Sequence, residues 1–285
     1  MPYPLGVETA VVIAIVGGLG LALIATILVL SKSKDGGTLA AVPPPEVPPS
    51  ALTPESLKKR YGRPGFLPET EPGDHGKSHF CGRPWLAEGE AWPSCGRCGE
   101  PMQLFLQLDL DALPNGAPAQ RSGGLAQLFY CVNSKSECEI HAESWEPFKP
   151  ATMARVVDPT QPGAQAADDL AHEPFPAQTI TGWQELDDLP NWEELLKMDV
   201  VMTPEVESYL EEAETPQDGD KLGGWPHWVQ GVEYPTCPDC GDPMELLFQL
   251  DSEDHVPFMF GDAGVGHLTR CRRHSTKLAF GWACG

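Results

Sequence analysis

The sequence is poor in basic residues. Its 285 residues include 19 Lys and Arg against 41 Asp and Glu, so the formal net charge is −22. Proteins that bind nucleic acid without reading its sequence use Lys and Arg to displace counterions from the phosphates. A chain this acidic repels phosphate backbones. We therefore expect no nucleic-acid partner.

The short motifs that mark several common enzyme sites are also missing. The sequence has no Gly-x-Ser-x-Gly, which places a nucleophilic serine on a tight turn, and no His-Glu-x-x-His, which binds a catalytic zinc ion. Residues 73–78 end like a phosphate-binding loop, but Glu71 stands where that loop needs its first glycine. The sequence therefore gives no positive sign of catalysis.

Charged residues are absent from residues 9–30. A helix of this length is about 33 Å long, enough to cross a hydrocarbon core of about 30 Å. Lys32 and Lys34 follow it, so the positive-inside bias predicts a single-pass anchor over residues 1–34 in a bacterial inner membrane, with the body in the cytoplasm. A cleaved signal peptide is the alternative, although residues 1–8 lack the Lys or Arg of a typical one.

Small residues recur at every fourth position of this apolar segment, at Ala14, Gly18, Ala22 and Thr26. Such a stripe lets two helices approach closely, so the chain has a route to a homodimer. Ordinary use of Gly and Ala in membrane helices is the favoured explanation of the stripe.

The next segments are a linker and a short helix. Residues 35–52 are rich in Pro, Gly and Ala, which predicts a stiff, extended spacer. Thr53 then offers an N-cap and Pro54 a first helical residue, so a short helix is expected to open the lead-in over residues 53–79. The remaining residues, 80–285, form the body.

The body contains a duplication. Residues 92–109 recur as residues 234–251, an offset of 142 without gaps, and ten of the eighteen positions are identical. Background composition would match about one of them. Further along, Gly124 and Cys131 match Gly264 and Cys271 after a two-residue deletion. The copies extend over about residues 80–157 and 222–285.

Each copy predicts a turn followed by a half-buried strand. Alternating apolar residues follow each pair of cysteines, at Met102, Leu104, Leu106 and Leu108, and at Met244, Leu246, Phe248 and Leu250. Between the copies, residues 191–198 and 203–213 have the caps and periodicity of helices. We therefore predict an α+β fold: an N-terminal transmembrane helix, then two pseudo-equivalent β units, each stapled by zinc, joined by a helical connection.

The cysteines have the spacing of metal ligands. The predicted sets are Cys95, Cys98, Cys131 and Cys138 in the first copy, and Cys237, Cys240, Cys271 and His274 in the second, where Cys284 is a rival for the fourth position. Cys-x-x-Cys puts two sulfurs on one turn, within about 2.3 Å of a tetrahedral ion. Disulfides are the alternative, but a reducing compartment and an odd count of nine cysteines disfavour them. Two Zn²⁺ ions are therefore expected.

Four protein ligands leave no coordination position for water or substrate, which is typical of structural zinc. An enzyme is therefore not the leading prediction. If His274 were displaced, the second site would open, so a zinc-dependent hydrolase stays as the alternative. Arg270, Arg272, Arg273 and Lys277 lie beside this site and either offset thiolate charge or form an anion-binding patch. Cys81 lies outside both sets and is expected to be a buried, unreactive thiol.

Several phrases resemble the YwqG-like family of uncharacterised bacterial proteins: Lys-Leu-Gly-Gly-Trp-Pro-His-Trp-Val-Gln (residues 221–230), Gln-Leu-Asp (249–251), Gly-Asp-Ala-Gly (261–264), Trp-Ala-Cys (282–284) and the stretch 180–190. The resemblance covers about residues 80–285. It implies a duplicated α+β domain of unknown function and supplies no catalytic residues.

These observations together predict a membrane-tethered binding or interaction module stabilised by zinc. Its candidate ligand-binding residues lie at the ends of the duplicated strands, at Gln107, Asp109, Gln249 and Asp251, unless these polar groups are simply satisfied within the fold. The expected partner is a protein. In one version, the chain is an immunity protein whose acidic surface complements a basic toxin.

Overall fold

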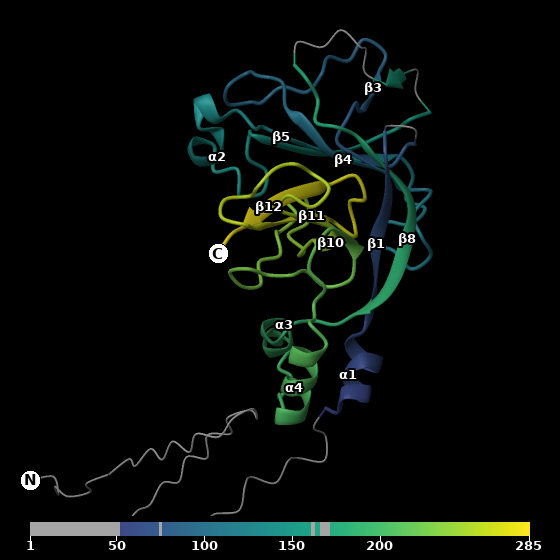
Figure 1. Cartoon of the computed structure of the whole chain (residues 1–285), viewed down its shortest axis with the longest axis vertical. Coiled ribbons are helices and arrows are strands. Elements are labelled where there is room, and N and C mark those ends of the chain that lie inside the picture. Colours follow the sequence, from purple (N-terminus) through teal and green to yellow (C-terminus); the bar gives the residue numbers. More distant parts are fainter. Residues whose placement is uncertain (1–51, 74–75, 161–162, 166–171) are drawn as a thin grey trace, which may run out of the picture. The chain divides into compact units, whose positions relative to one another are not determined.

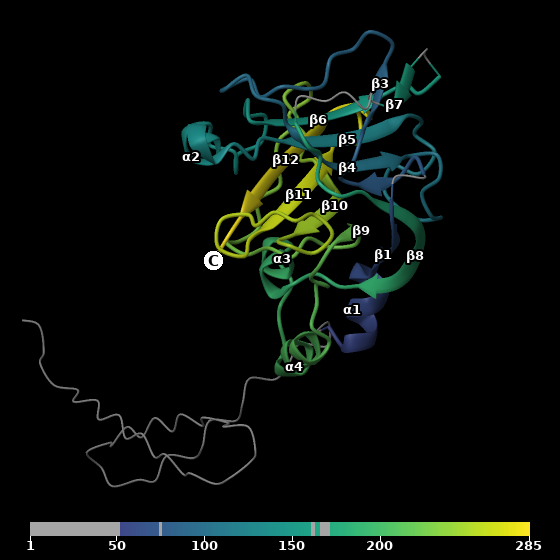
Figure 2. The same cartoon turned by 45° about the horizontal axis from the view of Figure 1, so that its top comes forward.

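The computed structural model describes residues 52–285 except 74–75, 161–162 and 166–171, which belong to one compact unit, Pro49–Gly285. Ten strands form a single antiparallel sheet in the order β12-β11-β10-β9-β1-β8-β2-β4-β5-β6 (Figures 1 and 2). The strands are β1 Arg63–Pro72, β2 His79–Phe80, β4 Gln103–Asp109, β5 Leu125–Tyr130, β6 Thr152–Val157, β8 Gln178–Asp188, β9 Lys221–Gly223, β10 Glu245–Asp251, β11 Val265–Arg270 and β12 Leu278–Ala283. Strands β3 (Trp85–Ala87) and β7 (Gly163–Gln165) pair separately.

The strand order is symmetric about its centre. Strands β2, β4, β5 and β6 on one side correspond to β9, β10, β11 and β12 on the other. The two long central strands are exchanged between the copies, because β1 pairs with β9 of the second copy and β8 pairs with β2 of the first. They also pair with each other along their whole length. The duplication therefore builds one continuous sheet.

The main core lies inside the curl of this sheet. The two edge strands, β6 and β12, contact each other, and Trp282 Nε1 donates a hydrogen bond to Tyr130 Oη at 2.9 Å between β12 and β5. Aromatic side chains from both copies meet in this core, including Phe80, Phe105, Tyr130, Phe248, Phe260 and Phe280. Sequestering this apolar area from water drives the folding of both halves together.

A β-bulge changes the face of each duplicated strand. The register of β4 against β5 shifts between Leu104 and Leu106, and that of β10 against β11 shifts between Leu246 and Phe248, the equivalent positions. An extra residue turns the side chains that follow to the other face. Met102 therefore packs among the cysteines, whereas Leu106 lies in the main core.

The expectation of a half-buried strand was wrong for both copies. Strand β4 is buried from Gln103 to Leu108, and β10 from Leu246 to Leu250. Alternation of apolar residues predicts one covered face, but the curled sheet covers one face and the metal-ligand loops and neighbouring segments cover much of the other.

Three helices, α1 (Pro54–Tyr61), α3 (Trp192–Lys197) and α4 (Pro204–Glu212), gather at one end of the described unit, and α2 (Cys138–His141) lies apart from them (Figure 1). The predicted helices form as α1, α3 and α4, with side-chain caps at Thr53, Asn191 and Thr203. Their buried side chains share a small core that includes Leu57, Leu195, Val206 and Leu210. Short helices η1 (Ser134–Ser136) and α2 (Cys138–His141) follow β5.

The predicted fold class was wrong. In the described residues the structure is mostly one antiparallel sheet with a few short helices, rather than two β units joined by a helical connection. The physical reason is the exchange of β1 and β8, which hydrogen-bonds the two halves into one sheet and leaves the helices at its periphery.

The predicted location was also wrong. Within the part of the chain that the structure describes, no helix has the length and apolar character of a membrane span, and this finding stands against the predicted single-pass inner-membrane location. The predicted anchor and small-residue stripe, within residues 1–34, and the spacer up to residue 51 lie outside the described residues.

Candidate metal centres and the family signature

The first cluster forms where a tight turn meets the end of β5. Cys95 and Cys98 lie on a turn closed by a bridge between Ser94 and Pro101, and the Gly99 N–H donates to the Cys95 carbonyl at 2.9 Å. Gly99 has φ +77°, which favours glycine. Cys131 follows β5 directly, and its N–H donates to the Ala151 carbonyl at 2.9 Å.

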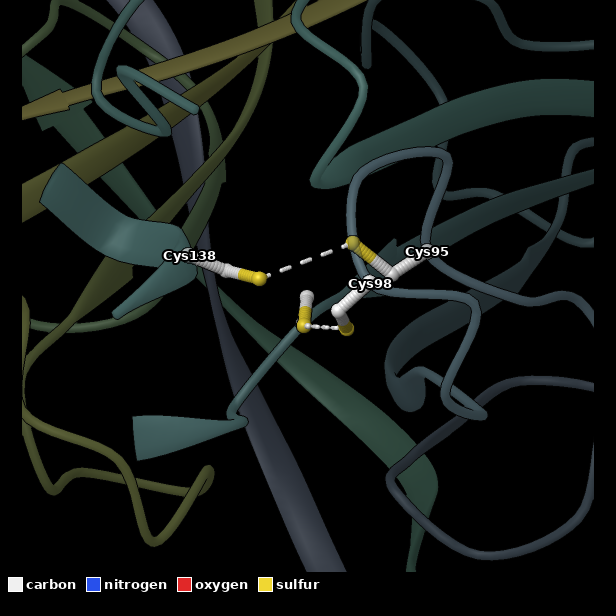
Figure 3. Close-up of side chains that lie close together, drawn as sticks. Cys95, Cys98 and Cys138 are labelled. Atoms are coloured by element: carbon white, nitrogen blue, oxygen red, sulfur yellow. Dashed lines mark hydrogen bonds between the residues drawn. The ribbon is translucent and has the colours of Figure 1, made fainter. Parts of the chain in front are cut away.

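The four sulfurs of this cluster converge. Cys138, at the start of α2, points toward Cys95 and Cys98 in Figure 3. The Sγ atoms of Cys95 and Cys138 are 3.9 Å apart, and those of Cys98 and Cys131 are 3.8 Å apart. Tetrahedral coordination of zinc at about 2.3 Å places neighbouring sulfurs about 3.8 Å apart. The distances fit a four-thiolate metal site and are far too long for disulfide bonds.

The second cluster repeats this geometry at the equivalent place. Cys237 and Cys240 share a turn closed by the bridge between Thr236 and Pro243. Cys240 Sγ lies 3.6 Å from Cys271 Sγ, while Nδ1 of His274 lies 3.6 Å from Cys237 Sγ and 3.7 Å from Cys271 Sγ. A nitrogen and a sulfur bound to one tetrahedral zinc ion are about 3.6 Å apart.

Each cluster has the chemistry of a cation site. All four ligand atoms of a set lie within 4.8 Å of one another, so ionising one thiol disfavours ionising its neighbours. Burial, the largest influence, raises the pKa of Cys138 to about 11. Burial acts in the same direction on Cys98, but hydrogen bonds, led by the Glu100 N–H, lower its pKa to about 7. A bound divalent cation would stabilise all the thiolates at once. Both clusters can therefore hold a metal ion.

The structure separates the two rivals for the fourth ligand. His274 belongs to the second cluster, and Cys284 does not. The Cys284 side chain lies instead against Gly261 and Gly264, where any side chain would collide with it.

The basic residues beside the second cluster are engaged by carboxylates. Arg272 pairs with Glu245 at 2.5 Å, Arg273 with Asp242 at 3.4 Å, and Lys277 with Asp239 at 3.2 Å. Arg270 lies 3.8 Å from Glu245. These pairs do not leave the free anion-binding patch considered from the sequence.

The remaining cysteine, Cys81, is fully buried. Burial, followed by the nearby charge of Asp220, raises the pKa of its thiol to about 12. A thiol held in its neutral form is a poor nucleophile, as expected from the sequence.

The predicted ligand-binding glutamines are buried inside the fold. Gln107 is 3% exposed and Gln249 is fully buried. Gln107 Oε1 accepts the Trp85 N–H at 2.9 Å, and Gln249 Oε1 accepts the His227 N–H at 2.7 Å. Asp109 pairs with Lys77 at 3.4 Å, and Asp251 accepts the Gly219 N–H at 3.1 Å. These four residues order the chain segments around the strands and do not form an exposed binding surface.

A third cluster of titratable side chains was not predicted from the sequence. Asp220, Asp254 and His255 converge beside β9, and Nδ1 of His255 lies 2.9 Å from Asp220 Oδ2. Burial raises the pKa of Asp220 to about 6. The pKa of His255 is also raised, because its contacts with Asp220 and Asp254 outweigh the lowering effect of burial. No spacing in the sequence signals this group, because Ser78 occupies the equivalent position of the first copy.

Two of the phrases on which the family resemblance was based meet at one buried ion pair. Asp188, from the stretch 180–190, lies 2.8 Å from Nζ of Lys221, and neither side chain is exposed. Its carboxylate also accepts the N–H groups of Leu189, Gln217 and Trp225 at 2.8 to 3.1 Å. A side chain at Gly224 would collide with this carboxylate. The phrase Lys-Leu-Gly-Gly-Trp therefore encloses Asp188 where β8 ends.

The fold and these sites define a duplicated antiparallel-sheet protein with two candidate metal centres. Residues 78–280 match the family described as Domain of unknown function (DUF1963), and the chain belongs to this family. Over 39 residues it is 51% identical to a protein of Salmonella typhimurium strain LT2 named "Uncharacterized protein YpfL". That match covers 14% of this chain and 9% of the Salmonella protein.

Proposed function

We propose that this protein is a binding module in which two structural zinc ions fix the loops of a duplicated sheet. The observation that carries the proposal is the closure of both ligand sets, in which four protein atoms converge at tetrahedral spacing. Zinc suits three or four thiolates, with histidine as the remaining ligand. Each ion would tie the turn before β4 or β10 to the end of β5 or β11.

A zinc-dependent hydrolase at the second cluster is the weaker alternative. A catalytic zinc ion needs an open coordination position, and His274 Nδ1 stands at the fourth corner of this cluster. The binding role is therefore favoured.

Metal analysis of the full chain purified without chelator tests the zinc proposal. We expect two zinc ions per chain, and Cys95→Ser or Cys237→Ser should each remove one ion and destabilise its own half. A stoichiometry near zero with oxidised cysteines would refute the proposal, and loss of both ions from either change would indicate one shared site.

The proposed partner is a basic protein, in the manner of an immunity protein that neutralises a toxin. The formal charge of −22 supports this version, because opposite charge accelerates encounter and selects partners. A partner recognised in this way should dissociate faster and associate more slowly as salt rises. Binding that is insensitive to ionic strength would count against it.

We also propose that the chain is one of the YwqG-like proteins within this family. This assignment is supported by the joint structural role of two shared phrases around Asp188 and Lys221. We would expect a YwqG-like relative to keep this buried pair even where it lacks the cysteines.

A further inference from the structure

A pocket of about 470 Å³ opens beside β12. Five of its lining side chains are aromatic, and they come from three separate segments: Trp145, Phe148, Trp228, Tyr234 and Trp282. Thr236, which directly precedes the metal ligand Cys237, also lines it. Neither ligand set nor the ion pair of Asp188 uses this pocket.

The two halves of the sheet differ at one equivalent position of their edge strands, where the first half has an arginine and the second a glycine. In the first half, Arg155 pairs in register with Gln127, and its Nε donates to Gln127 Oε1 at 2.8 Å. Arg155 also binds Glu90. In the second half, Gly281 stands opposite His267. A side chain at Gly281 would collide with the Trp145 carbonyl, so the glycine lets residues 145–148 lie against β12 and supply one wall of the pocket.

The aromatic rings form two corners. The rings of Trp145 and Trp282 are 6.3 Å apart with an angle of 81° between their planes, and those of Trp228 and Tyr234 are 5.1 Å apart at 83°. Trp228 Nε1 and Tyr234 Oη both donate to Glu194 Oε1, at 2.8 and 2.6 Å. The polar edges of this second pair are therefore already satisfied, so the pair offers the pocket ring surface only, and the Trp228 ring also packs against His267 at 4.5 Å.

The charges around the pocket are negative. Glu146 and Glu233 line it and are exposed, and its lining includes no Lys or Arg. His267 is buried at the pocket. Burial, followed by the nearby charge of Lys221, lowers the pKa of His267 to about 3, so this ring is neutral at pH 7. A cation entering the pocket would meet aromatic rings and the carboxylates of Glu146 and Glu233, and no Lys or Arg among the lining residues.

We propose that this pocket binds a small organic cation carrying a quaternary ammonium group, of the choline class. Perpendicular aromatic walls are the arrangement that recognises such groups, because each ring face is negative and the methyl groups need no hydrogen bonds. This inference rests on the proposed function as a binding module and names the ligand class. Zinc at the second cluster would fix the wall formed by Thr236.

Titration of the full chain with choline, followed by calorimetry, tests this inference. The neutral isostere 3,3-dimethylbutan-1-ol has the same shape without the charge, so it should bind at least about tenfold more weakly. Phe148→Leu and Glu233→Gln should each weaken choline binding by about threefold or more. Both residues are exposed, so the fold should tolerate the changes. Trp192→Leu, a change at an exposed tryptophan on α3 outside the pocket lining, should leave binding unchanged.

Equal binding of the alcohol and choline would overturn the inference, as would absence of saturable choline binding up to about 50 mM. A loss in Trp192→Leu equal to that in Phe148→Leu would place the ligand elsewhere. Failure of choline binding in protein that still contains two zinc ions would refute only this ligand class. Failure to find zinc would instead remove the basis of the proposed function.

Discussion

Replacing Asp188 with asparagine should destabilise the protein more than any change to an exposed charge. The substitution keeps the size of the side chain but removes the negative charge that faces Lys221 Nζ at 2.8 Å. It also puts an amide donor or a single remaining oxygen before N–H groups from Leu189, Gln217 and Trp225. Breaking one partner of a buried ion pair costs about 3–5 kcal/mol, a large part of the usual stability of about 5–15 kcal/mol.

The loss of stability in Asp188→Asn cannot exceed the free energy needed to remove the proton from Lys221. Burial lowers the pKa of this amine, and Asp188 opposes that effect. Without the carboxylate, Lys221 can shed its proton, and neutralising an amine of pKa about 10.4 at pH 7 costs about 5 kcal/mol. In Asp188→Asn the unfolded state then binds one proton more than the folded state. Its stability should therefore rise by about 1.4 kcal/mol per pH unit between pH 7 and 9, relative to the wild type.

Urea unfolding at pH 7, 8 and 9 provides the measurement, with Lys221→Met as the matched variant. Lys221→Met leaves Asp188 three backbone N–H donors, so it should cost less than Asp188→Asn and show no such pH slope. The double variant should cost less than the sum of the two. Additive losses, or a loss below about 1 kcal/mol in Asp188→Asn, would refute a buried charged pair.

His274→Ala should weaken metal binding at the second cluster and leave binding at the first unchanged, whereas Cys284→Ser should have almost no effect on either. The charge-transfer bands of the cobalt-loaded protein provide the measurement, and the reverse result would make Cys284 the ligand. The pKa of Asp220 is raised to about 6, so its stabilising contribution is lost as pH rises from about 4 to about 6. The pKa of His255 is raised from about 6.5, so its contribution is lost only as pH rises above that value. Asp220→Asn should therefore flatten the stability profile between about pH 4 and about pH 6 in urea unfolding, and an unchanged slope would contradict the assignment. The pKa of His267 is lowered in the folded state, so its contribution to stability is lost as pH falls below about 6.5, by up to about 1.4 kcal/mol per pH unit. His267→Gln should remove this acid sensitivity in thermal unfolding. If the sensitivity persists in the variant, another group is responsible for it.

Local patterns in the sequence predicted the parts of this structure that depend on local spacing. The Cys-x-x-Cys turns, the helices after Asn191 and Thr203, and the strands after Met102 and Met244 all form near their predicted positions. A tight turn or a helix cap is decided by a few neighbouring residues, so its signal survives without tertiary context.

Features that depend on distant pairing could not be predicted in this way. Strands β1 and β8 carry no part of the recognised repeat, yet they form the centre of the sheet and decide that the two halves are joined. The bulges after Leu104 and Leu246 change which face the side chains point to, but the sequence does not reveal them, because apolar residues continue on both sides of each bulge. The aromatic pocket depends on residues 145–148 lying against Gly281, a contact between segments far apart in the sequence.

The exchange of the two central strands has a consequence for how such a chain can arise and be divided. Each copy lends its first long strand to the other, so a polypeptide with one copy alone would lack the strand that borders its own β2 or β9. Two such polypeptides could supply each other and rebuild the same sheet as a symmetric dimer. The present chain has the strand arrangement that a strand-swapped pair would have if its two members were joined covalently. Cutting it between β6 and β8 should give two fragments that reassemble with each other.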